Sequence, residues 1–155
     1  MKKLNHILVP LDGSELSEKA LEAAFTLAKL SGATLTFLRA LRPVDDIIKI
    51  DEHNAIYVDE QIEYKTIRAT KYLESVKDMA KKKSMPAHIV VETGLAAEII
   101  IEYAKNNFVD LIVMATHGRT GLQRWFYGST AAKVLSGANH PVLLVRSFSD
   151  ATTKE

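Results

Sequence analysis

Short apolar runs alternate with longer amphipathic segments along this chain, and this alternation constrains the fold more than any other feature. The five apolar runs cover residues 6–10, 34–40, 87–92, 111–115 and 142–145. Strands that are apolar throughout are typical of parallel sheets covered on both faces. The order βαβαβαβαβ therefore predicts an α/β fold, with a five-stranded parallel sheet between two layers of helices.

The segments between these runs have helical spacing. Helices are expected from Ser14 to a cap at Gly32, and over residues 58–83, 96–106 and 129–136, while residues 41–54 read as irregular. Two apolar stripes are expected to face the core. The first helix carries Leu16, Ala20, Ala23, Leu27 and Leu30, and the long helix carries Ile62, Tyr64, Ile67, Tyr72, Leu73 and Val76.

Length and charge restrict the class of protein. A chain of 155 residues is the size of one domain, which we expect over residues 1–147, followed by a polar tail over 148–155. The formal net charge of +1 gives no overall field to attract nucleic acid or an anionic membrane, and the run Lys81-Lys82-Lys83 reads as a solvated helix end. The absence of cysteine excludes disulfides and thiolate chemistry.

No export or membrane segment is expected. The apolar stretch after Lys2 and Lys3 is interrupted by Asp12 and Glu15, and no run approaches the roughly 18 to 20 apolar residues that span a bilayer. These features predict a cytoplasmic protein without a membrane partner.

A ligand site is expected at one end of the sheet. Open parallel sheets bind ligands beyond the carboxyl ends of their strands, where the strand order reverses. Right-handed crossovers favour the order 3-2-1-4-5, which would place Pro10, Leu11 and Asp12 opposite the loop that begins at Ala115. That loop contains Gly118, Gly121 and Gly128.

The loop has the features of a phosphate site. Glycine lets backbone N–H groups approach an anion, and the helix that opens with Ser129 and Thr130 adds free donors and the positive end of its dipole. The residues 115–129 are thus predicted to hold the phosphates of a nucleotide such as ATP. A sharp turn alone would also explain the glycines.

Four motifs are distinctive: Ile7-Leu8-Val9-Pro10-Leu11-Asp12-Gly13-Ser14, Met114-Ala115-Thr116-His117-Gly118-Arg119-Thr120-Gly121, Gly128-Ser129 and His140-Pro141-Val142-Leu143-Leu144-Val145. Together they resemble the universal stress protein family. The ATP-binding members carry Gly, two residues, Gly, nine residues, Gly, then Ser or Thr. Gly118, nine residues and Gly128-Ser129 match this pattern, whereas Ala115 replaces the first glycine.

The resemblance implies a Rossmann-like three-layer fold of the adenine nucleotide alpha hydrolase type, with strand order 3-2-1-4-5, and usually a homodimer. It implies ATP between the ends of strands one and four. Pro10, Leu11 and Asp12 would then meet adenine and ribose, and Ala40 would flank the adenine. The ribose and phosphates would meet Met114, Ala115, Gly118, Gly128, Ser129 and Thr130. The Ala115 methyl group would weaken binding rather than abolish it.

Other residues of the loop and the first turn admit two interpretations. Asp12 would contact the ligand or cap the turn before the first helix. Arg119 and Arg124 would pair with phosphate or remain solvated, and residues 125–127 (Trp-Phe-Tyr) would anchor the loop or shelter a nucleotide. His117 reads as loop packing or a phosphate contact. The five histidines show no metal-ligand spacing, so any Mg²⁺ would arrive on the nucleotide.

The last strand is an edge in the proposed order. Val142, Leu143, Leu144 and Val145 are too apolar to leave an edge open to water, so pairing with a second copy is expected.

Three functions are compatible with these features. The first is an ATP-binding regulatory protein of the stress response, and a related alternative is a family member that acts through protein partners without a nucleotide. The second is a slow ATPase or nucleotidyl transferase, for which no water-orienting residue and no Walker lysine pattern is found. The third is a phosphoacceptor receiver domain, which Glu92 at the end of strand three and the glycine loop disfavour.

Overall fold

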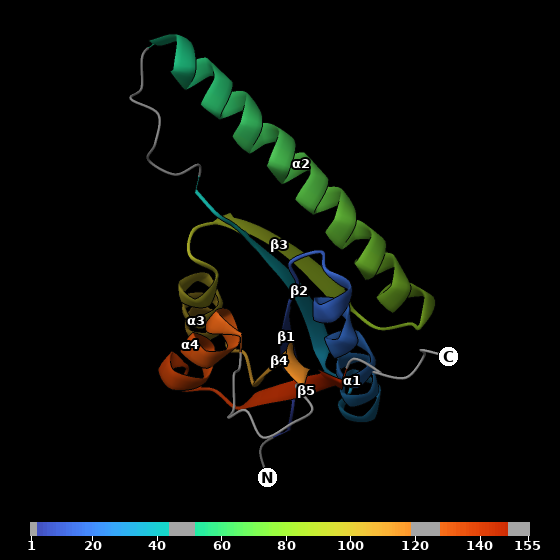
Figure 1. Cartoon of the computed structure of the whole chain (residues 1–155). Coiled ribbons are helices and arrows are strands. Elements are labelled where there is room, and N and C mark those ends of the chain that lie inside the picture. The colour runs from blue at the N-terminus through green and yellow to red at the C-terminus, as the bar shows by residue number, and fades with distance from the viewer. Residues whose placement is uncertain (1–2, 44–51, 119–127, 149–155) are drawn as a thin grey trace, which may run out of the picture.

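The computed structural model describes residues 3–43, 52–118 and 128–148, with backbone only at 52–59, 117–118 and 148. The chain alternates strands and helices throughout this part (Figure 1). The elements are β1 (His6–Pro10), α1 (Glu15–Ser31), β2 (Thr34–Leu41), α2 (Glu52–Lys82), β3 (Ala87–Thr93), α3 (Ala96–Asn106), β4 (Leu111–Gly118), α4 (Ser129–Gly137) and β5 (Val142–Phe148).

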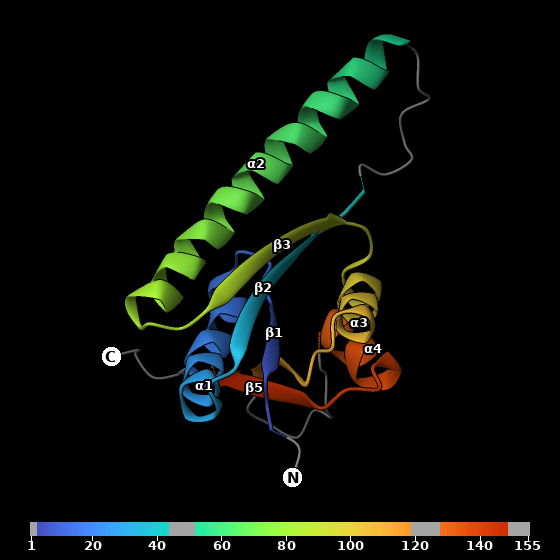
Figure 2. The same cartoon turned by 180° about the vertical axis from the view of Figure 1, so that it is seen from behind.

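The strands form one parallel sheet in the order β3-β2-β1-β4-β5, which confirms the predicted topology. Helices α1 and α2 cover one face and α3 and α4 the other (Figures 1 and 2). Right-handed crossovers explain this arrangement, because the chain winds outward in one direction through β1, β2 and β3 and in the other through β4 and β5.

The core lies on both faces of the sheet, because successive strand side chains point to opposite sides. Ile7 and Val9 of β1 pack under α1 with Phe37 of β2, whereas Leu8 faces α3 with Leu38. Each fully buried large side chain contributes about 1.5–3 kcal/mol of hydrophobic free energy. The two layers together fix β1 and β4 at the centre of the sheet.

Helix α1 begins and ends as its sequence predicts, but its buried face differs. Ser14 Oγ accepts a hydrogen bond from Ser17 N–H over 3.1 Å, and Gly32 closes the helix with φ of 73°. The buried residues are Ala20, Leu21, Ala24, Phe25 and Ala28. The predicted stripe is therefore wrong in part, since the larger Phe25 and Leu21 turn inward and Leu30 stays 80% exposed.

Helix α2 starts six residues before the predicted position. No glycine or proline lies between Pro43 and Pro86 to stop it, so the helix extends back to Glu52. The irregular segment predicted over 41–54 is thus wrong at both ends, because Leu41 belongs to β2 and residues 52–54 belong to α2. Residues 44–51 lie outside the described residues.

The first half of α2 extends beyond the sheet (Figures 1 and 2). Leu73 and Val76 of the predicted stripe are buried, and Ile62 and Tyr72 are half-buried. Tyr64 and Ile67, however, are 57% and 58% exposed, so the prediction of a core-facing stripe is wrong for these two. No described element covers these two side chains.

Strands β4 and β5 are both three residues longer than their apolar runs. Thr116 pairs with Arg146 and His117 with Ser147, so the ladder continues where the side chains become polar. Backbone hydrogen bonds stabilise these pairs without regard to side-chain polarity. Gly118 therefore ends a strand instead of lying in the predicted loop, and β5 forms the edge of the sheet as predicted. Among the described helices, none is long and apolar enough to cross a membrane.

Candidate functional site

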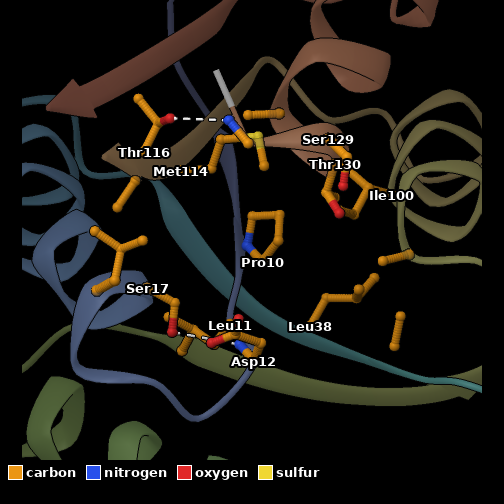
Figure 3. Close-up of a pocket in the computed structure, with 16 residues that line it drawn as sticks. Pro10, Leu11, Asp12, Ser17, Leu38, Ile100, Met114, Thr116, Ser129 and Thr130 are labelled. Carbon is orange, nitrogen blue, oxygen red and sulfur yellow. Dashed lines mark hydrogen bonds between the residues drawn. The ribbon is translucent and has the colours of Figure 1, made fainter. Parts of the chain in front are cut away.

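A pocket of about 250 Å³ opens at the carboxyl ends of β1 and β4. The two strands are neighbours at the centre of the sheet, where the strand order reverses, and crossover helices leave toward opposite faces. This is the position at which open α/β sheets bind ligands. In Figure 3, Ser129 and Thr130 lie on one side of the pocket and Asp12 and Ser17 on the other, with Pro10 between them.

The structure brings most of the predicted site residues together. Of the ten, nine line this pocket: Pro10, Leu11, Asp12, Ala40, Met114, Ala115, Gly128, Ser129 and Thr130. Gly118, the tenth, is described only as the last backbone position of β4. The geometry thus places residues that are far apart in the sequence around one space, while their contact with a ligand stays a prediction.

Sequence reasoning missed further lining residues. These are Leu16, Ser17, Leu38, Ala96, Ile100, Thr116 and Ala131. Leu16 and Ser17 come from the first turn of α1, and Ala96 opens α3. Their position in the chain could have identified them. Helices that follow parallel strands begin at the end of the sheet where the carboxyl ends of the strands lie. Thr116 was the easiest to find, since it directly follows the apolar run of β4.

The apolar side of the pocket can take a flat ring. Leu38, Ile100 and Met114 are nearly or fully buried in the layer beneath α3 and α4, and they line the pocket around Pro10 (Figure 3). Ligand pockets combine such apolar walls with a few polar groups that fix orientation. The wall therefore suits an aromatic base more than a sugar or a free anion.

On the opposite side, the pocket is lined by the start of helix α4. Gly128 is the N-cap residue, no side chain among the described residues caps this helix, and its first turn contains no acid. The first N–H groups of an uncapped helix lack intrahelical partners and attract anions. The hydroxyl groups of Ser129 and Thr130 add donors at the same place.

Thr116 fixes this helix start against the sheet. Its side chain is buried at the end of β4, and its Oγ1 accepts a long hydrogen bond of 3.4 Å from Gly128 N–H. The bond directs the Gly128 backbone toward the pocket. Gly128 itself has φ of −52°, and a Cβ there would meet no described atom within 4 Å. Nothing in the described part of the chain requires glycine at this position, which favours a role in close ligand approach.

Asp12 both shapes the turn and faces the pocket. Its Oδ1 accepts a hydrogen bond from Ser14 N–H over 2.8 Å. Partial burial raises the pKa of Asp12, but hydrogen bonds from Ser14 and Ser17 outweigh burial and hold it below its usual value of 3.8. The carboxylate therefore stays ionised at neutral pH, and it can accept hydrogen bonds from ribose hydroxyls.

The remaining loop candidates cannot be placed. Arg119, Gly121, Arg124 and residues 125–127 lie outside the described residues, as does the His117 side chain. Within the described part of the chain, no group of three His, Cys, Asp or Glu side chains is arranged to hold a metal ion.

Comparison with known proteins decides the family. The model of the universal stress protein family matches residues 3–146. The chain belongs to this family. A universal stress protein of Bacillus subtilis, YxiE, is 35% identical over 149 residues, which cover 92% of this chain and 99% of the relative.

Solved structures of universal stress proteins share the fold. The protein UspA from Lactobacillus plantarum aligns with a TM-score of 0.80 at 22% identity, covering 94% of this chain and 100% of that one. A universal stress protein in complex with cAMP aligns with a TM-score of 0.66 at 21% identity, covering 94% and 98%. A family protein from Arabidopsis thaliana with AMP bound also aligns at 0.66, with 16% identity and 97% coverage of both chains.

Proposed function

We propose that this universal stress protein is a cytoplasmic regulator of the stress response that binds ATP in the pocket between β1 and β4. The observation that carries the proposal is the pairing, within one pocket, of an apolar wall with the uncapped start of α4. A base and a phosphate chain need these two environments side by side. The family neighbours bound to cAMP and AMP support an adenine nucleotide.

Different lining residues are assigned to the base, the ribose and the phosphates of the nucleotide. Pro10, Leu11 and Ala40 meet the adenine, and the Asp12 carboxylate accepts from the ribose. The phosphates lie toward α4, where the donors are concentrated. We assign to the ribose and phosphates together the residues Met114, Ala115, Gly118, Gly128, Ser129 and Thr130, of which all but Gly118 line the pocket. Mg²⁺ comes with the phosphates, since it keeps most of its water ligands and prefers phosphate oxygens.

The geometry supports binding more directly than hydrolysis. The described polar groups at the start of α4 are N–H and O–H donors, which hold an anion. The carboxylate of Asp12 lies on the other side of Pro10, away from the start of α4 (Figure 3). A bound nucleotide would therefore act as a signal that changes the surface offered to partners.

Isothermal titration of Mg-ATP into the wild-type protein tests the function. A few charge-assisted hydrogen bonds of about 1.5–3 kcal/mol each support a Kd in the micromolar range. Adenosine should bind measurably more weakly, because it lacks the groups that meet α4. No heat of binding with millimolar ATP would refute the proposal and direct attention to protein partners.

The first glycine of the family motif gives a second prediction. Ala115 is half-buried in β4 and lines the pocket, so its methyl group stands where ATP-binding members have none. Ala115→Gly should tighten ATP binding by about threefold to tenfold, a gain of roughly 1 kcal/mol from relieved crowding. Titration of both proteins measures the ratio. Equal affinities would show that the methyl group does not crowd the ligand.

We also propose a homodimer through β5. This edge strand presents Val142, Leu144 and Val145 half-buried and Leu143 38% exposed. Light scattering at micromolar concentration should give twice the mass of one chain, and Leu143→Lys should reduce it to one. Leu135→Lys is the matched control, because Leu135 on α4 has the same exposure of 38%. A wild-type monomer would contradict the dimer.

A further inference from the structure

A second cavity lies beside the first, between α2 and the end of β2. Its volume is about 590 Å³, and it shares only Asp12 and Ala40 with the first pocket. Gln61, Tyr64 and Tyr72 come from α2. The residues that line this groove from α2 lie between positions 61 and 72, in the middle of the helix.

This α2–β2 groove is strongly basic. Arg39 and Arg42 line it from β2 and the residues just after it, and Lys65 and Arg68 line it from α2. Asp12 is the only acid that lines it among the described residues. The four cations contrast with a net charge of +1 for the whole chain. They form no ion pair with any residue in the described part of the structure.

Aromatic rings position two of the guanidinium groups. Arg39 Cζ lies 5.5 Å from the centre of the Tyr72 ring, and Arg68 Cζ lies 5.6 Å from the centre of the Tyr64 ring. Tyr72 is itself fixed, because its hydroxyl donates a hydrogen bond of 2.8 Å to Glu18 Oε1. A guanidinium group stacked on a ring keeps its N–H donors available for an anion.

The turn before α1 leaves room for Arg39. Gly13 has φ of +84°, and a Cβ at this position would lie 2.8 Å from Arg39 Nη1. Glycine thus permits both the turn and the close approach of the guanidinium group. The half-buried Arg39 is held over this turn, next to the wall that the two cavities share.

We propose that the α2–β2 groove is a second ligand site, which binds phosphate groups. Arginine pairs bind phosphate oxygens through parallel N–H donors, and the lysine adds a mobile positive charge. The phosphate belongs either to a free anion or to a nucleotide. The proposal does not depend on ATP binding between β1 and β4, because the four cations lie outside that pocket.

The test is a titration with pyrophosphate, followed by NMR of the backbone amides in a Gly128→Val background. This background removes competition from the start of α4. Shifts are expected at Gly13, Arg39 and Arg68. The double substitution Arg39→Gln with Arg68→Gln should weaken pyrophosphate binding by about tenfold or more. The single substitution Lys65→Gln should weaken pyrophosphate binding by about threefold. Because Lys65 is exposed on the helix, this variant keeps the test valid if the double variant fails to fold.

The matched control is Lys81→Gln with Lys82→Gln, which removes the same charge from exposed positions at the far end of α2. It should change affinity by less than about twofold, since exposed charges are screened over such distances. An equal loss of pyrophosphate affinity in the two double variants would mean that only the total charge of the protein matters, and it would overturn the proposal. The absence of amide shifts at the groove would overturn it as well.

Two further arms complete the experiment. ATP that displaces pyrophosphate in the same background would identify nucleotide phosphate as the source, and ATP that fails to displace it would identify a free anion. The chain also carries Asp45 and Asp46 soon after Arg42. If Asp45→Asn with Asp46→Asn raised pyrophosphate affinity by more than about tenfold, the chain's own acids would be the occupant and the proposal would fail.

Discussion

Replacement of Gly128 by valine is expected to weaken ATP binding by about 100-fold or more, because the loss of two charge-assisted hydrogen bonds amounts to about 3 kcal/mol. Gly128 begins α4 at the edge of the pocket, held by Thr116. A branched side chain would occupy the space through which the phosphates reach the first N–H groups. Isothermal titration of the two proteins gives the ratio.

The same substitution should leave the fold almost unchanged. Gly128 has negative φ, and no described atom lies within 4 Å of the Cβ position. Valine is a poorer N-cap than glycine by about 1 kcal/mol, which lowers Tm by about 2–4 °C in a protein of this size. A loss of binding together with a large loss of stability would instead indicate a damaged fold.

Gly32→Val is the matched control for Gly128→Val. Gly32 ends α1 with φ of 73° and lies just before β2, at the amino-terminal end of the strands, whereas the pocket lies at their carboxyl ends. Valine in this left-handed conformation should destabilise the protein by about 2 kcal/mol and leave ATP affinity unchanged. If Gly128→Val bound ATP normally, the start of α4 would not hold the phosphates.

Truncation of Leu73 to alanine is expected to lower the free energy of unfolding by about 2–5 kcal/mol. Leu73 is completely buried between α2 and the sheet, in the cluster that contains Phe37. The change leaves a cavity as well as removing apolar area from the core. Urea unfolding followed by circular dichroism measures the difference.

Ile67→Ala provides the comparison within the same helix. Ile67 lies six residues earlier on α2 and is 58% exposed, so its truncation should change the free energy of unfolding by at most about 0.5 kcal/mol. Equal losses for Leu73 and Ile67 would mean that the first half of α2 is packed in solution. That result would contradict the groove between α2 and β2.

The topology could be predicted because it follows from local patterns and a chirality rule. The apolar runs located all five strands, and the capping residues Ser14 and Gly32 marked both ends of α1. Right-handed crossovers then favoured the observed strand order. These signals depend on short stretches of sequence, which a single chain displays completely.

Exposure could not be predicted with the same accuracy. A helical stripe shows which residues share a face, and it does not show whether another element reaches that face. Tyr64 and Ile67 continue the pattern of Leu73 and Val76, yet they are largely exposed, and the first half of α2 extends beyond the sheet (Figure 1). Strand length was underestimated for a related reason, since the ladder of β4 and β5 continues through polar Thr116.

The candidate site shows the same division. Residues at or near strand ends, such as Pro10 at the end of β1 and Ala115 in the last half of β4, were found from the topology and the family motifs. Ser17, Ala96 and Ile100 were missed because they enter from helices that the sequence pattern does not orient. The α2–β2 groove was also missed, since Arg39 of β2 and Arg68 of α2 come together only because α2 packs beside the end of β2.

A crystal structure of the protein grown with Mg-ATP tests the central claim most directly. We expect density for adenine against Pro10 and Ala40 and for phosphates at the N–H groups of Ser129 and Thr130. A nucleotide bound elsewhere, or bound with its phosphates away from α4, would contradict the account.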